Sequence, residues 1–220
     1  MSSTTSYRLS GIALILGSVL SIIYYVSEVF INGPFPEALA GPVAVIGSLI
    51  GFIGSVFVLL GLPGMYARQA KPAGILGLLG FLFVWYVILF QGILITFTSV
   101  TIVPMLVTDP ATRHILAAGP LASFTPFSIP SEVGQVLGIL LLAIATLRAR
   151  VFPRWIPWLL IATLVLNAAS LVPFFPNELG SVAVIIGYLP LFGFGYALLS
   201  PERHESMEAQ PSSVNAEARV

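Results

Sequence analysis

The chain contains no cysteine. Disulfide bridges, thiolate metal sites and cysteine nucleophiles are therefore excluded. Charge is also scarce, because Asp, Glu, Lys and Arg make up 8% of the residues, against about 25% in soluble domains. A chain with so few charges cannot cover a surface that faces water, so most of its area must face an apolar solvent. The nine basic and nine acidic residues cancel, so net charge gives no reason to expect a nucleic-acid partner.

Apolar residues are abundant instead, at 57% of the sequence, with a mean hydropathy of +1.01. A membrane-spanning helix needs about 20 mainly apolar residues, and six runs of that kind are separated by Pro, Gly and charged residues. We expect an all-α polytopic bundle, a single domain followed by a disordered tail at residues 201–220. The six expected spans are residues 9–31, 42–62, 73–103, 131–147, 155–175 and 179–199.

Two of these runs have alternatives. The first is followed by Ala38-Leu39-Ala40, which resembles a signal-peptide cleavage site. Its apolar run of about 23 residues is longer than the 7–15 of a signal peptide, so an uncleaved span is favoured. The third run would be about 46 Å long as a straight helix, so it must tilt, project outward or break. A break at Gln91-Gly92 would give seven spans.

The basic residues decide between six and seven spans. With six spans and the N-terminus inside, eight of the nine lie on the cytoplasmic side and only Arg113 lies outside, as the positive-inside rule requires. With seven spans, Arg148, Arg150 and Arg154 fall opposite Arg8, and neither orientation is well biased. The sequence therefore predicts six spans with both termini in the cytoplasm.

The outer connection at residues 104–130 is the longest. Asp109-Pro110 is typical of a helix N-cap followed by Pro at the first helical position, and Gly119-Pro120 of a helix end. We expect a short helix at residues 110–118, on the outer surface.

Polar side chains at membrane depth are functional candidates by default, and here they gather toward the outer face. Glu132 and Gln135 share a helix face and, with Tyr24, Tyr25, Thr98 and Arg113 or His114, could line an outward-facing vestibule. The simpler interpretation, which we favour, places Glu28 and the other carboxylates in the headgroup layer, Glu132 and Glu178 at helix N-termini. The candidate outer cluster comprises Glu28, Gln91, Glu132, Gln135, Glu178, Arg113 and His114.

Other polar and small residues have structural interpretations. Asn167, near the middle of the fifth span, is expected to hydrogen-bond a neighbouring helix. Gly47 and Gly51 form a G-x-x-x-G pattern that lets helices approach closely, within the chain or in a homo-oligomer. Four inner basic residues are candidates for contacts with anionic lipid headgroups, although setting the topology is the favoured role. They are Lys71, Arg148, Arg150 and Arg154.

No catalytic or metal-binding motif is present. The two histidines, His114 and His204, fall on opposite sides of the expected membrane, so they cannot share a metal. We expect no cofactor.

Two junctions carry a resemblance. They are GLPGMYARQ at residues 61–69, followed by AGILG at residues 73–77, and ATLRARVFPRW at residues 145–155. Both resemble junctions in small, uncharacterised bacterial multi-pass membrane proteins, common in actinobacteria and related phyla, over residues 8–200. The resemblance implies a protein of the bacterial plasma membrane and carries no activity.

The favoured function is a non-enzymatic accessory or small-ligand-binding membrane component. The alternative is a transporter or channel for small solutes, although the inner half of every span is nearly free of polar side chains. A membrane-embedded enzyme comes third. A water-filled cavity near Gln91 and Asn167 would discriminate among them, because a dry bundle excludes transport.

Overall fold

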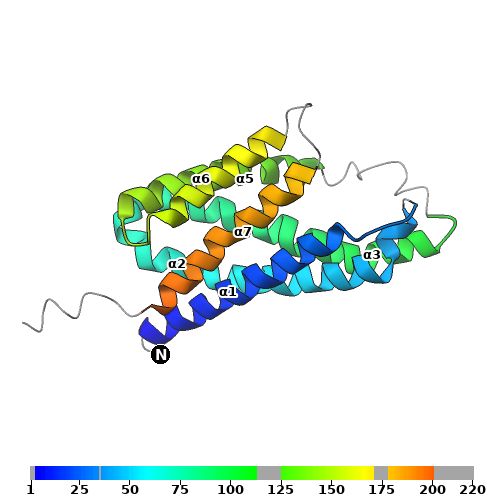
Figure 1. Cartoon of the computed structure of the whole chain (residues 1–220), viewed down its shortest axis with the longest axis horizontal. Coiled ribbons are helices and arrows are strands. Elements are labelled where there is room, and N and C mark those ends of the chain that lie inside the picture. The colour runs from blue at the N-terminus through cyan, green and yellow to red at the C-terminus, as the bar shows by residue number, and fades with distance from the viewer. Residues whose placement is uncertain (1–2, 35, 113–124, 171–177, 201–220) are drawn as a thin grey trace, which may run out of the picture.

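The regular structure of the described residues is entirely helical (Figure 1). A computed structural model describes residues 3–34, 36–112, 125–170 and 178–200. The expected all-α fold is confirmed over these ranges. The elements are α1 (Ser3–Glu28), η1 (Glu37–Ala40), α2 (Pro42–Val87), η2 (Ile88–Ile95), α3 (Thr96–Thr108), α5 (Thr125–Ala149), α6 (Trp155–Ser170) and α7 (Glu178–Leu199).

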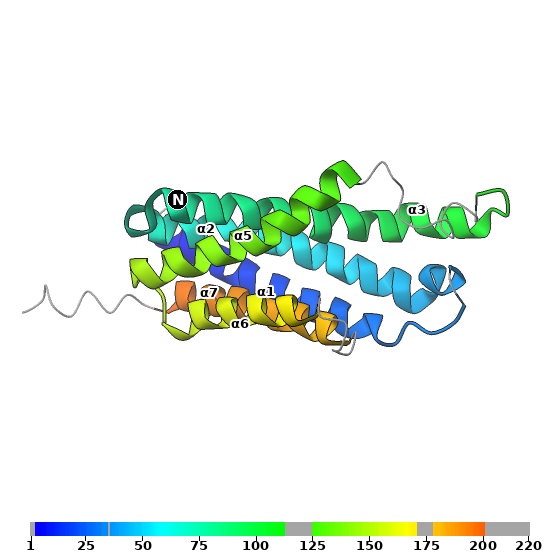
Figure 2. The same ribbon diagram turned by 90° about the horizontal axis from the view of Figure 1, so that it is seen from above.

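The helix α2 consists of two arms that meet at Gly74. Pro42 occupies the first turn after the extended Gly41, where its fixed φ suits a helix start. Gly74 then leaves helical geometry with φ +57° and ψ −152°, and the chain reverses direction. The ring centroids of Tyr66 and Phe81, one on each arm, are 4.9 Å apart. Phe52 of the first arm pairs in the same way, at 6.2 Å, with Phe97 of α3, which continues the second arm. The first arm is therefore antiparallel to the second arm and its continuation through η2 and α3 (Figure 2), and these segments contain the second and third expected spans.

The long third run does not break at Gln91-Gly92. The helix continues through η2, an eight-residue π-helical segment from Ile88 to Ile95, and then through α3. The Thr96 hydroxyl donates to the Gly92 carbonyl oxygen, which satisfies a backbone group where the α-helical ladder is interrupted. The long third run thus forms one continuous helix with a change of pitch at η2. It extends to Thr108, beyond the end expected at residue 103.

Among the described residues, four helical runs are long and apolar enough to cross a membrane: Thr4–Glu28, Pro42–Thr108, Pro126–Ala149 and Val182–Leu199. The second of these contains both arms of the hairpin, and α6 supplies a shorter apolar helix, Trp155–Ala169. These lengths and compositions are compatible with the membrane protein that the sequence predicts.

The expected surface helix at residues 110–118 lies mostly outside the described residues. Its first three residues, 110–112, form a turn, in which Asp109 Oδ1 accepts a hydrogen bond of 2.9 Å from the Ala111 amide. The described helix α5 begins at Thr125, six residues before the span expected from residue 131. The tail, residues 201–220, also lies outside the described part of the chain.

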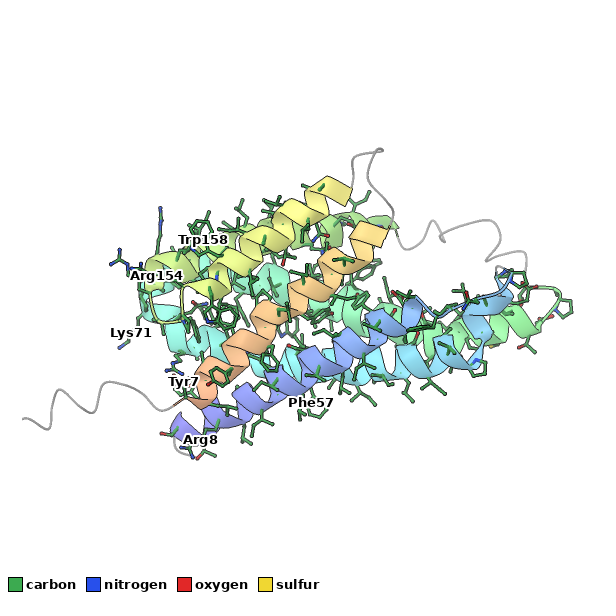
Figure 3. All side chains as sticks on the ribbon, in the orientation of Figure 1. Tyr7, Arg8, Phe57, Lys71, Arg154 and Trp158 are labelled. Carbon is green, nitrogen blue, oxygen red and sulfur yellow. The ribbon has the colours of Figure 1, made fainter. Side chains whose placement is uncertain are left out.

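The described charges separate to the two ends of the bundle. Arg8, Lys71 and Arg154 all lie at one end in Figure 3. Arg68 joins them, since its Nη1 donates to the carbonyl oxygen of Ala197 at 2.7 Å. We call this the basic end, which also includes Arg148 in the last turn of α5 and Arg150 just after it. The opposite, acidic end holds Glu28, Glu37, Asp109 and Glu132.

The helix α1 packs against the first arm of α2 and against α7. Gly47 and Gly51 face this contact: a Cβ at Gly47 would meet the Ser27 side chain, and one at Gly51 would meet the Tyr24 ring. The G-x-x-x-G pattern therefore serves packing within the chain. Self-association through Gly47 and Gly51 stays a prediction, and it would require α1 to move away.

Candidate ligand pocket

An internal cavity of about 100 Å³ lies between α1, the second arm with η2, α5, α6 and α7. Its walls are mainly aliphatic, but Gln91, Gln135 and Asn167 stand among them. We call this space the inner cavity. Its apolar lining residues are Val84, Val87, Ile88, Ile139, Leu142, Leu160, Val184 and Leu191.

A second hollow, of about 380 Å³, adjoins the inner cavity toward the acidic end. Five residues line both spaces, so the two lie side by side, and we call them together the pocket: they are Tyr25, Gln91, Gln135, Asn167 and Val184. We call the second hollow the vestibule. Its other lining residues are Tyr24, Glu28, Phe90, Ile95, Ser128 and Glu132.

The structure brings together four residues of the candidate outer cluster, because Glu28, Gln91, Glu132 and Gln135 all line the vestibule. Thr98, considered with them, lies elsewhere on the helix, where its hydroxyl donates to the Leu94 carbonyl oxygen at 2.8 Å. Three members cannot be placed in the pocket: Arg113 and His114 lie outside the described residues, as does the side chain of Glu178, the first residue of α7.

Two amides in the pocket wall lack partners among the residues that the structure describes. Neither Gln91 nor Gln135, both half-buried, makes a hydrogen bond with any described residue. Each amide carries two donors and one acceptor, and leaving such groups unpaired in an apolar environment costs on the order of 1–3 kcal/mol by mutational measures. The pocket therefore needs polar contents, either water or a ligand.

Asn167 occupies the junction of the two spaces. Its Nδ2 donates to the Thr163 carbonyl oxygen at 2.9 Å, one turn earlier in α6. The expected bond to a neighbouring helix stays a prediction. Asn167 also lines both parts of the pocket, where it would contact whatever the pocket holds.

Aromatic residues form the wall on the α1 and α7 side. The ring centroids of Tyr24 and Tyr25 are 4.8 Å apart, and those of Tyr25 and Tyr188 are 5.8 Å apart. The Tyr24 hydroxyl interacts with the Glu28 carboxylate and with Ser48. The sequence pointed to Tyr24 and Tyr25 but not to Tyr188, because only the rotation of α7 turns that ring inward.

The π-helical segment forms part of the wall. Ile88, Gln91 and Gly92 of η2 line the inner cavity, and Gly92 lies so close to Ser55 that a Cβ would come within 2.8 Å of the Ser55 Cβ. Such segments occur frequently at functional sites. No compositional signal announces a π-helix, although the excess length of the run and Gln91-Gly92 marked the position.

The basic end of the bundle is closed. Leu14, Leu62, Met65 and Phe194 are fully buried there. Nearby, the Thr146 hydroxyl donates to Oε1 of the buried Gln69 at 3.1 Å. The guanidinium of Arg68 lies 5.9 Å from the centroid of the Phe152 ring. The pocket thus ends against a closely packed core, in which the buried Nε2 of Gln69 has no hydrogen-bond partner among the described residues.

The candidate lipid-contacting residues are exposed at this closed end: Lys71, Arg148, Arg150 and Arg154. Their contact with anionic headgroups stays a prediction. Among the residues that the structure describes, no three His, Asp or Glu side chains gather in a way that would hold a metal ion.

No family model matches the chain, and no curated protein or solved structure matches it either. The resemblance to bacterial multi-pass membrane proteins therefore stays a prediction.

Proposed function

We propose that this chain is a six-span protein of the bacterial plasma membrane, with both termini cytoplasmic, and that it binds a small ligand in the pocket between its helices. The unpaired amides of Gln91 and Gln135 carry the proposal. Polar groups at membrane depth are costly unless they have partners. A sequence that keeps two of them beside a cavity is suited to binding something polar there.

The separation of charge supports the orientation. Every described basic residue lies at the end where we place the cytoplasm, in agreement with the positive-inside rule. The described part of α6 has sixteen residues, about 24 Å at 1.5 Å per residue, and it ends where the described range ends. Even a span of this length is accommodated by local thinning of the bilayer, which costs fractions of a kcal/mol per Å.

Cysteine labelling tests the orientation without background, because the native chain has no cysteine. An Asp109→Cys variant should react with a membrane-impermeant maleimide in intact cells. An Arg150→Cys variant should react only after the cells are permeabilised. Labelling of both variants from outside would rule out the six-span arrangement.

Binding is favoured over catalysis because the pocket offers carboxylates, amides and phenols but no activated nucleophile among its described residues. Binding is favoured over a channel because the inner cavity stops at the fully buried side chains of Leu62, Met65 and Phe194. A channel would need a continuous polar path through this layer.

Two cysteine variants on α5 form a matched test of the pocket. Gln135 lines the vestibule, whereas Thr146, farther along the same helix, is only 1% exposed. In the folded, purified protein, a small hydrophilic thiol reagent should modify Gln135→Cys at least about tenfold faster than Thr146→Cys. Equal, slow modification of both, with fast modification after denaturation, would show that no accessible pocket exists.

A transporter is the second candidate, and the π-helical segment at Gln91 and Gly92 favours it, since a wall with an interrupted hydrogen-bond ladder can change shape. Transport requires the basic end to open. Modification of Thr146→Cys in inside-out vesicles would indicate such opening and favour transport over binding alone.

A further inference from the structure

We infer that the pocket takes a small organic cation: an ammonium group held in the vestibule near Glu28 and Glu132, with a short alkyl chain in the inner cavity. This inference rests on the proposed function and names the ligand class of the same pocket. Three independent features of the lining carry it, namely its charge, its aromatic rings and the apolar nature of its deep part.

The charge of the vestibule is negative. Glu28 and Glu132 line it, and no described Lys, Arg or His lines either part of the pocket. Glu132 makes no ion pair or hydrogen bond with a described residue. Walls of low dielectric focus the field of such carboxylates and raise the local concentration of cations.

The aromatic rings of the vestibule suit an ammonium head. Tyr24, Tyr25 and Phe90 line the space together with the carboxylates. The faces of such rings attract cations within about 6 Å, and groups of rings are a common means of binding quaternary ammonium ligands. An anion would find no compensating charge among these side chains.

The deep part of the pocket suits an alkyl chain. Beyond Gln91, Gln135 and Asn167, the lining is mainly aliphatic, with Tyr25, Tyr188 and Thr163 as the exceptions. The inner cavity, at about 100 Å³, is smaller than an engineered cavity of about 150 Å³ that holds benzene. A chain of about four to six carbons fits this space. The amides at the junction lie where the N–H groups of a primary ammonium can meet their carbonyl oxygens.

The test uses the full-length Val184→Cys protein in lipid nanodiscs, because Val184 lines both parts of the pocket and is not one of the polar groups proposed to hold the ammonium. Protection from a thiol reagent is the readout. Hexylammonium should protect the thiol, whereas hexanoate and hexanol, matched in chain length, should not. Affinity should rise about fourfold per methylene up to about six carbons and then level off. A Gly187→Leu variant, which places a side chain in the cavity lining, should abolish the gain from chain length.

Charge variants locate the head group. Glu28→Gln and Glu132→Gln should each weaken protection by hexylammonium about tenfold or more, because each removes a charge that faces the cation. Glu37→Gln, at the same acidic end but outside the vestibule and inner cavity, should leave it unchanged. Unaltered thermal unfolding of each variant would show that folding is intact.

The outcomes separate the two proposals. If the thiol reacts but hexylammonium fails to protect it, or if hexanol and hexanoate protect it equally well, the cation inference is overturned while the proposal of a pocket stands. An unreactive thiol overturns both. The nanodisc lipid distinguishes a lipid headgroup from a soluble amine. If the thiol is protected without added amine in nanodiscs containing phosphatidylethanolamine, but not in those of phosphatidylglycerol alone, the cation is a lipid headgroup.

Discussion

Replacing Gly17 with alanine is expected to lower the free energy of unfolding by about 1–3 kcal/mol. A Cβ at Gly17 would lie 2.6 Å from the Val58 amide nitrogen and 2.7 Å from the Gly54 carbonyl oxygen. These are backbone atoms of the facing helix, so they cannot rotate away. The helices α1 and α2 must separate instead, and the contacts on either side of Gly17 weaken. Unfolding in mixed micelles by added SDS measures the change.

The sign of this change is diagnostic, because alanine normally stabilises a helix relative to glycine by up to about 1 kcal/mol. Gly134→Ala on α5 is the matched control. Its nearest neighbour would be the Phe83 ring at 3.5 Å, an ordinary contact, so this variant should be as stable as the native protein or slightly more. A stable Gly17→Ala would mean that α1 does not pack here, leaving the α2 glycines free for a second copy.

This packing was only partly predictable. The spacing of Gly47 and Gly51 predicts a close helix contact but does not identify the partner helix. The partner depends on which face of α1 presents Ser27 and Tyr24 to these glycines. That choice follows from the folding of the whole bundle, in which α1 also contacts α7.

Hydropathy predicted the positions of the helices and some of their ends, namely the starts at Pro42 and Trp155 and the end at Leu199, but it did not predict their polar extensions. The polar residues after residue 62 mark a change of environment, yet the first arm of α2 continues through Pro63 and on to Gly74. Backbone hydrogen bonds do not depend on whether a side chain faces lipid or water. Hydropathy therefore predicts the apolar part of a helix and misses its polar extension.

The vestibule carboxylates could be predicted because polar residues at membrane depth are rare enough to stand out. Phe90 and Tyr188 could not, since apolar and aromatic residues occur throughout the spans. Whether such a side chain faces the pocket or the surroundings is set by helix rotation. Phe90 and Gln91 both line the vestibule and both belong to η2, where the π-helical pitch changes the direction in which successive side chains point.

Replacing Gly74 with alanine is the second substitution for which we expect a large loss of stability, about 1–3 kcal/mol. Gly74 is exposed, and a Cβ there would meet nothing within 4 Å. Crowding therefore plays no part. The cost comes from the backbone alone, because φ +57° with ψ −152° is a conformation that only glycine adopts without strain. The chain needs this backbone conformation to reverse direction, so that the second arm packs against the first.

Arg150 supplies a control of opposite sign. It follows the last turn of α5 with φ +52°, and its amide donates to the Thr146 carbonyl oxygen at 3.2 Å, an arrangement that usually places glycine at this position. Arg150→Gly should relieve strain and raise stability by up to about 1 kcal/mol. Both residues lie at the basic end, so the pair separates backbone strain from position in the membrane. If Gly74→Ala proved as stable as the native protein, the chain would not make its tight reversal through a strained backbone conformation at this residue. Loss of stability in Arg150→Gly would instead indicate that the charge at this position outweighs the strain.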